Sequence, residues 1–289
     1  MNYLLHILVM IDIYVILALS LNLLVGYTGL VSLCHAAFYG IGAYVTTLLM
    51  MNLHVPFFIA MLIGVIGSAV LSMSISIPSL RLRGDYFVLA SLGFQMIIFA
   101  ILYNWVSVTR GPYGIPGIPR PSIFGFKIDT LLLFFIFTTV IMLICGVALY
   151  LIAESPFGRV LKAIREDEIA TSAIGKSITY YKVVAFAIAG GFAAISGSLF
   201  SAYMQYIDPT SFTLMESIFI LCIIIIGGTG NIVGPIVGAV VLIILPEALR
   251  FLRIPDAIAA NMRQIIYGLL MLAILRYRPE GIAGGYRLQ

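Results

Sequence analysis

Long apolar stretches without a single charge dominate the pattern of this chain. Residues 13–80 contain no Asp, Glu, Lys or Arg, a run long enough for three membrane-spanning helices of about 20 residues each. Turns within it are predicted at residues 26–29 and 51–56, where glycine, proline and polar residues interrupt the apolar sequence. Further uncharged runs cover residues 86–109, 130–153, 183–207 and 217–246.

These runs, together with residues 257–275, predict one all-α transmembrane domain over residues 1–289. About nine spans are expected (8–10), and Arg263 in the last of them must face protein or extend to an interface. Composition supports this, because 62% of the residues are hydrophobic and only 10% are charged, against roughly 25% charged in soluble domains. Soluble enzymes, disulfide scaffolds, disordered tails and nucleic-acid binders are excluded.

The distribution of basic residues predicts the direction of insertion. Nine crossings with the N-terminus outside and the C-terminus inside place ten of the 16 basic residues inside, as expected for cytoplasmic loops. The inside residues are Arg81, Arg83, Arg159, Lys162, Arg165, Lys176, Lys182, Arg276, Arg278 and Arg287; the outside ones are Arg110, Arg120, Lys127, Arg250, Arg253 and Arg263.

Two connections are longer than turns. Residues 105–127 lie outside and are rich in proline and glycine, which predicts a stiff, extended and non-helical segment. It is either a plain connector or a docking surface. Residues 154–182 form the main inside loop.

The inside loop is predicted to hold one amphipathic helix. Ser155 and Pro156 are typical of a helix start and Gly175 of a helix end. An approximate apolar face comprises Phe157, Val160, Leu161, Ile164, Ala170, Ala173 and Ile174. The bases Arg159, Lys162 and Arg165 form a stripe ahead of the acids Glu166, Asp167 and Glu168.

This order of charges opposes the helix dipole, so either anionic lipid or a protein partner is expected to favour the basic stripe. Gly175-Lys176-Ser177 resembles the end of a phosphate-binding loop. However, Ala170 stands where such a loop requires glycine and no strand precedes it. No nucleotide site is predicted in this chain.

Two glycine-rich elements echo each other in the two halves of the chain. The first contains Gly26, Thr28 and Gly29, and the second contains Gly228, Thr229 and Gly230. The helix expected from about Leu214 to Ile226 spans only about 20 Å, less than the ~30 Å hydrocarbon core. The two elements therefore predict either broken helices along a translocation pathway or close packing through small residues.

Few other residues offer chemistry. Asp12 is expected to pair within the bundle or to take part in coupling, and Glu216 is assigned to a capping box with Thr213. Cys34, Cys145 and Cys222 lie in apolar runs and are expected to be buried hydrophobic residues. An interfacial amphipathic helix is expected around Glu247, Arg250, Arg253 and Asp256. No catalytic or metal-binding cluster is predicted, and the scarcity of intramembrane carboxylates argues against ion coupling.

Several strings resemble the permeases of branched-chain amino acid ABC importers. In the first half they are Ser20-Leu-Asn-Leu-Leu-Val-Gly-Tyr-Thr-Gly29, Ala37-Phe-Tyr-Gly-Ile-Gly-Ala-Tyr44 and Leu80-Arg-Leu-Arg-Gly-Asp-Tyr86. Later in the chain they are Gly158-Arg-Val-Leu-Lys-Ala-Ile-Arg-Glu-Asp-Glu168, Gly227-Gly-Thr-Gly-Asn-Ile-Val-Gly-Pro235 and Arg278-Pro-Glu-Gly281. The third and fourth are similar to the M-type (LivM-like) member of the permease pair.

The resemblance implies a non-catalytic, multi-pass permease in a bacterial inner membrane. It would work with a second similar permease, two cytoplasmic ATPases that bind the ATP and Mg, and an external binding protein, and would hold no cofactor itself. Residues 158–175 would be the coupling helix, although Ile169-Ala170-Thr171 departs from the common Glu-Ala-Ala signature. Urea or short-chain amides are alternative substrates, and an ion-coupled transporter or a membrane enzyme are rival classes.

Overall fold

Helices account for almost all of the regular structure, as expected where no water is present to satisfy backbone groups. The computed structural model describes residues 2–79, 82, 84–123, 126–250, 256–278 and 280–284. The long helices are α1 Asn2–Thr28, α2 His35–Asn52, α3 Phe57–Ser79, α4 Asp85–Asn104, α6 Leu131–Glu154, α9 Ile178–Met204, α10 Leu214–Gly227, α11 Val233–Arg250 and α12 Asp256–Tyr277. The short ones are α5 Val106–Thr109, α7 Pro156–Glu166, α8 Glu168–Ala173, and the 3-10 turns η1 Gly111–Tyr113 and η2 Pro209–Phe212.

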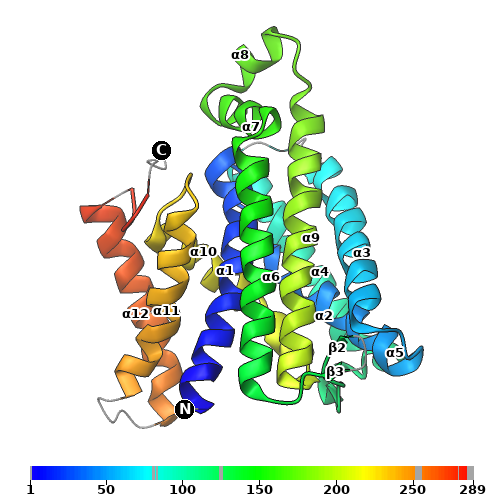
Figure 1. Cartoon of the computed structure of the whole chain (residues 1–289). Coiled ribbons are helices and arrows are strands. Elements are labelled where there is room, and N and C mark those ends of the chain that lie inside the picture. Colours follow the sequence, from blue (N-terminus) through cyan, green and yellow to red (C-terminus); the bar gives the residue numbers. More distant parts are fainter. Residues whose placement is uncertain are drawn as a thin grey trace.

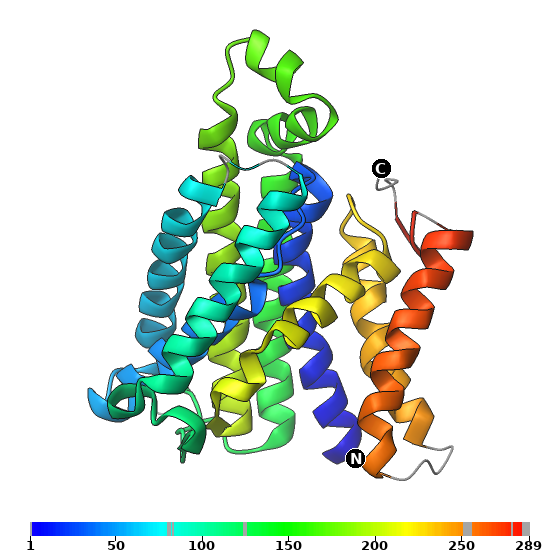
Figure 2. The same cartoon turned by 180° about the vertical axis from the view of Figure 1, so that it is seen from behind.

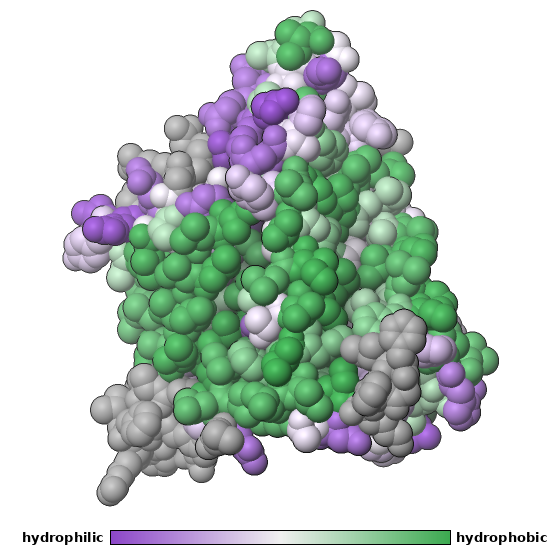
Figure 3. All heavy atoms as spheres, viewed as in Figure 1, coloured by the Kyte–Doolittle hydropathy of each residue, from purple (hydrophilic) through white to green (hydrophobic). Residues whose placement is uncertain are grey.

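Most of the long helices run between two ends of one bundle (Figure 1). Helices α1, α3, α4, α6 and α9 are each long and apolar enough to cross a membrane, and α10 and α11 are shorter apolar helices. The start of α1 and the end of α12 lie at opposite ends of the bundle (Figure 1), as an odd number of crossings requires. A hydrophobic band covers the face shown in Figure 3, with hydrophilic residues gathered beyond it at the α7 end. The predicted all-α membrane bundle is confirmed.

The core forms where α1, α2, α3 and α9 pack together. Helices α1 and α9 are buried along most of their length, whereas only a minority of the side chains of α3, α4 and α6 are buried. Small residues allow the closest contacts, as is usual between membrane helices. A Cβ atom on Gly197 of α9 would overlap the backbone of α2 at Tyr39. The three cysteines are buried and free, as predicted.

Two helices begin inside the bundle rather than at its ends. Helix α1 ends at Thr28, as predicted for the first turn, but the chain then turns back into the bundle before α2 begins. The first residue of α2, His35, hydrogen-bonds through Nε2 to Ser20 Oγ at 2.7 Å. Ser20 lies eight residues before Thr28, about 12 Å along the helix. Helix α2 therefore starts well below the end of α1.

The other such helix is α10, which crosses the bundle obliquely (Figure 2). It has 14 residues, about 21 Å, and its first turn meets the first turn of α2. The Ala36 amide donates to Ser217 Oγ at 2.9 Å. The N-termini of α2 and α10 thus lie side by side in the interior.

The connection after α4 departs from the sequence prediction. Residues 105–127 were expected to contain no helix, but α5 and η1 form there. Proline is compatible with the first turn of a helix, and Pro112 lies in the first turn of η1. The remainder is extended, and strand β1 (Ile115–Pro116) pairs antiparallel with β4 (Tyr206–Ile207), while β2 (Ser122–Ile123) pairs with β3 (Phe126–Lys127).

The interfacial helix expected around residues 247–256 is not a separate element among the described residues. Helix α11 continues through Pro246 to Arg250, and α12 begins at Asp256. The side chains of Glu247, Arg250 and Asp256 and the whole of Arg253 lie outside the described residues, so the predicted ion pairs there stay a prediction.

Candidate functional site: the helical projection and the glycine junction

Helices α7 and α8 project from one end of the bundle (Figure 1). Helix α7 begins as the sequence predicts, with Pro156 in its first turn and Ser155 as N-cap. The Ser155 hydroxyl oxygen accepts a hydrogen bond from the Gly158 amide at 3.3 Å. This cap fixes the direction in which the projection leaves α6.

The prediction of one helix up to Gly175 is wrong, because the chain breaks at Asp167. Its backbone is extended and its carboxylate accepts hydrogen bonds from the amides of Ile169 (2.8 Å) and Ala170 (3.0 Å). Asp167 thus ends α7 and caps α8, a role for which aspartate is strongly preferred. Gly175, in the left-handed region at φ +81°, follows the second helix.

The predicted apolar face holds for α7 only. Leu161 and Ile164 are buried against the bundle, whereas Ala170, Ala173 and Ile174 are exposed, because the break at Asp167 turns α8 in a new direction. Ile169 and Ile174 are 78% and 73% exposed. The tip of the projection is accordingly hydrophobic in Figure 3.

The basic side chains of the stripe bind mainly to groups of the same chain. This is an alternative to the lipid or partner binding that the sequence predicts. The Lys162 ammonium lies 3.1 Å from a Glu154 carboxylate oxygen and 5.3 Å from the ring centroid of Tyr27. Arg165 pairs with Glu166 at 2.8 Å and donates through Nη1 to the Gly26 carbonyl oxygen in the last turn of α1. Lys162 therefore joins α7 to the end of α6, and Arg165 joins it to the end of α1.

Loss of the contact between Arg165 and the Gly26 carbonyl is expected to lower activity, whereas loss of Arg159 in the same stripe is not. Arg165→Ala is expected to lower uptake roughly tenfold, because a charge-assisted hydrogen bond contributes about 1.5–3 kcal/mol. Arg159→Ala is the matched control, since Arg159 is exposed and its guanidinium reaches only the Glu154 carbonyl oxygen at 3.4 Å. Uptake assays at equal membrane levels measure both. Equal effects of the two changes would contradict the assignment.

The acids of the projection are more exposed than its bases. Glu166, Asp167 and Glu168 are all exposed, and Glu168 forms an ion pair with the buried Lys182 of α9. Together with the exposed isoleucines they give the tip an acidic and apolar surface. This differs from the basic surface that the sequence suggested.

A groove of about 820 Å³ lies between the projection and the bundle. Its walls come from the end of α1 and the following loop (Thr28, Gly29, Leu30, Val31), the start of α4, residues 164–169, and the start of α9. Gly29 adopts φ +72° and faces the Arg165 side chain, and the Thr28 hydroxyl donates to Leu24 O within its own helix. The first glycine element thus lies beside the projection.

The two glycine elements, remote in sequence, meet here. A Cβ atom on Gly26 would lie 2.5 Å from the backbone nitrogen of Gly230. Asn22 joins them, because its amide nitrogen donates to Asn231 O at 2.7 Å and its Oδ1 accepts from Gly230 N at 3.1 Å. We call this contact the glycine junction (Gly26, Gly228, Gly230, Asn22, Asn231).

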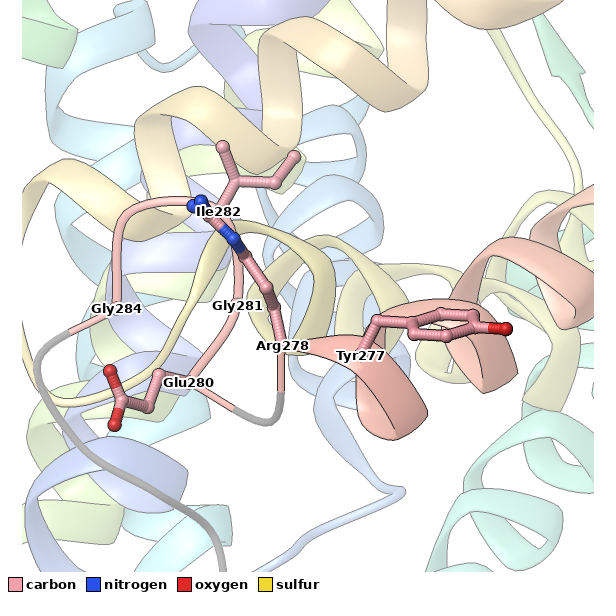
Figure 4. A pocket seen from close by; sticks show the side chains of 6 residues that line it. All are labelled: Tyr277, Arg278, Glu280, Gly281, Ile282 and Gly284. Atoms are coloured by element: carbon pink, nitrogen blue, oxygen red, sulfur yellow. The ribbon is translucent and has the colours of Figure 1, made fainter.

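The C-terminal segment closes the glycine junction from the other side. The amides of Ile282 and Ala283 donate to Ile226 O (3.0 Å) and Gly227 O (2.8 Å), carbonyls that the end of α10 leaves unpaired. The Asn231 side chain donates to Ala283 O. The segment curls around a cavity of about 370 Å³ lined by Tyr277, Arg278, Glu280, Gly281, Ile282 and Gly284 (Figure 4).

At its contact with this segment, the second glycine element is packed tightly against backbone. Gly228 has φ +110°, and a Cβ atom there would overlap the backbone of Gly284. Thr229 is 2% exposed and its hydroxyl has no partner among the described residues. The small residues of the glycine elements therefore pack closely, as one alternative predicted. A translocation pathway lined by these elements stays a prediction.

The polar residues that join helices were not predicted from the sequence. Asn22 and Asn231 lie within strings that carry the family resemblance and Gln95 lies in an uncharged run, but none of the three was predicted to join helices. Asp12 pairs within the bundle as one alternative predicted, accepting from the hydroxyls of Thr139 (2.7 Å) and Thr138 (3.2 Å).

The capping-box assignment of Glu216 is wrong. Helix α10 begins at Leu214 as expected, but Thr213 makes no side-chain cap. Glu216 instead accepts a hydrogen bond from the Tyr14 hydroxyl at 2.5 Å. Tertiary contact with α1 prevails over the local cap, and no pattern in the sequence signals it.

The hydrophobic band (Figure 3) and the five helices long enough to cross a membrane define a multi-pass membrane protein. A family model described as branched-chain amino acid transport system / permease component matches residues 3–275, and the chain belongs to this family.

Individual relatives agree with the family assignment. The high-affinity branched-chain amino acid transport system permease protein LivM of Salmonella typhimurium is 36% identical over 293 residues, covering 93% of this chain and 67% of that protein. The probable LivM of Methanocaldococcus jannaschii is 28% identical over 218 residues (71% and 62%). The autoinducer 2 import system permease protein LsrC of Salmonella typhi is 30% identical over 144 residues (48% and 40%). No solved structure matches the chain significantly.

Proposed function

We propose that this chain moves branched-chain amino acids across a bacterial inner membrane as the permease subunit of an ATP-driven importer. The observation that carries the substrate class is the similarity to permeases named for these amino acids over 93% of the chain. Urea and short-chain amides, the alternative substrates, have no such support among the relatives described above.

The projection is the proposed docking site for an ATPase. Exposed Ile169 and Ile174 lie beside Glu166, Asp167 and Glu168, an arrangement that suits a partner groove with an apolar floor and a basic rim. The α7–α8 end would then be cytoplasmic, with the C-terminus inside and the N-terminus outside. Arg159, Arg165, Lys182 and Arg276 at this end accord with that orientation.

Other partners complete the proposed importer. A second, similar permease would pair with this chain, two ATPases would bind ATP and Mg, and an external binding protein would deliver the amino acid. The broken helices α2 and α10 support a pathway near their N-termini, because helices that begin at membrane depth are typical of transport sites.

Uptake of radiolabelled leucine into proteoliposomes tests this function. The complete assembly, with its ATPases and binding protein, is expected to accumulate leucine only with ATP inside the compartment that holds α7 and α8. Urea serves as the matched substrate control and is expected to remain at background. Leucine uptake without ATP hydrolysis, or uptake of urea in place of leucine, would contradict the proposal.

A further inference from the structure

Glu216 lies near the middle of the membrane-spanning layer. Its carboxylate accepts a hydrogen bond from Tyr14, which is 12 residues after the start of α1 and 14 before its end, or about 18 and 21 Å along the helix axis. An ionisable side chain at this depth is costly and by default indicates function or a specific partner.

The described residues provide no cation for this carboxylate. Their ion pairs join Lys162 to Glu154, Arg165 to Glu166 and Lys182 to Glu168, all at the α7–α8 end. Asp12 differs from Glu216, because it is 5% exposed and accepts hydrogen bonds from two threonine hydroxyls. Glu216 is only partly buried, and its neighbour in α10, Met215, is exposed.

The polar groups around Glu216 come from the two helices that begin at depth and from α4. Gln95 Oε1 accepts from the Ala37 amide at 2.8 Å and from Ser217 Oγ at 3.3 Å. The Tyr39 hydroxyl is buried and has no hydrogen-bond partner among the described residues. Tyr39 lies about one turn along α2 from Ala36, whose amide binds Ser217, the residue next to Glu216. A buried hydroxyl without a partner is normally costly, and this one lies about one helical turn from the contact beside Glu216, whose carboxylate has no cation among the described residues.

We propose that Glu216 binds the α-ammonium group of the amino acid during its passage through the permease. This inference rests on the proposed function and assigns its substrate contact. An ammonium group carries three donors: it would replace the Tyr14 hydroxyl at Glu216 Oε1 and give the Tyr39 oxygen a donor. The contact would neutralise the carboxylate and the ammonium together at the depth where either alone is least stable.

Two substitutions at Glu216 separate charge from shape. Glu216→Gln keeps the side-chain length and an acceptor for Tyr14 but removes the charge, whereas Glu216→Asp keeps the charge and shortens the side chain. Leucine uptake by the reconstituted assembly is expected to fall at least about tenfold in Glu216→Gln, and Glu216→Asp is expected to retain severalfold more uptake than the Gln variant. ATP hydrolysis stimulated by the leucine-loaded binding protein is expected to persist in both. Asp12→Asn is the matched control, with uptake within about twofold of wild type.

If the role of Glu216 is purely structural, the Gln variant is expected to retain more uptake than the Asp variant. Glu216→Gln with at least half of wild-type uptake, or Glu216→Asp more damaging than Glu216→Gln per assembled complex, would overturn the inference. An equal loss in Asp12→Asn would overturn it too, because the loss would then follow from removing any buried acid. Absence of leucine uptake by the wild-type assembly would instead refute the proposed function.

Discussion

The double substitution Ile169→Glu and Ile174→Glu is expected to abolish uptake while the chain still inserts in the membrane. Both side chains are more than 70% exposed at the tip of the projection and contribute nothing to the core, so the fold is expected to survive. If both are buried by an ATPase, each loss costs roughly 2 kcal/mol of association. Uptake is then expected to fall by about 100-fold or more, since each 1.4 kcal/mol is a factor of ten.

The control for this prediction lies at the same end of the bundle. Tyr277, at the end of α12, is 83% exposed and lies outside the projection, so Tyr277→Glu is expected to leave uptake within about twofold. Co-purification of the ATPase with each variant measures docking directly, and uptake measures its consequence. Normal co-purification with the doubly substituted tip would exclude the projection as the docking site.

Leucine at both Gly228 and Gly230 is expected to disrupt the glycine junction. Both glycines have positive φ, +110° and +82°, which L side chains rarely adopt, and the backbone of Gly284 leaves no room for a side chain on Gly228. Overpacking costs about 1–3 kcal/mol and backbone strain adds about 1–3 kcal/mol per residue. The purified protein is expected to unfold at lower temperature and to lose most uptake.

Glycines elsewhere in the membrane helices supply a matched control. A Cβ atom on Gly67 of α3 or Gly93 of α4 would meet no atom within 4 Å, so Gly67→Leu and Gly93→Leu are expected to keep the stability of the isolated chain. Thermal unfolding in detergent, monitored by size-exclusion chromatography, compares the variant with Leu at 228 and 230 with the variants at 67 and 93. Wild-type stability and full uptake with Leu at both 228 and 230 would remove the hypothesis that this junction matters.

Most of the fold could be predicted because a bilayer restricts the solutions. The uncharged runs and the turns predicted within them lie over α1–α4, α6 and α9–α11, although α1 begins 11 residues before the first run. This agreement arises because length and hydropathy largely decide what can span the core. The start of α7 was likewise predictable from Ser155 and Pro156, whose effects are local. Its end was not, because Asp167 and Gly175 are both plausible stops and only the folded loop selects the first.

The contacts of the candidate sites could not be predicted. Arg165 belongs to a regular basic stripe in the sequence, yet it binds the Gly26 carbonyl, 139 residues away. Glu216 fits a capping box, yet its partner is Tyr14, 202 residues away. Periodicity carries no information on such distant partners, because it describes only neighbours along one helix.

The sequence by itself determined that the chain is an all-α membrane bundle and where its helices lie, because hydrophobicity and helical hydrogen bonding act locally in an apolar solvent. Only the tertiary structure decided which polar groups meet inside that bundle. It brought the two glycine elements into contact, turned the basic stripe toward α1, and left Glu216 at mid-depth without a cation in the part of the chain that is described. These pairings depend on how helices pack, and packing is a property of the whole chain.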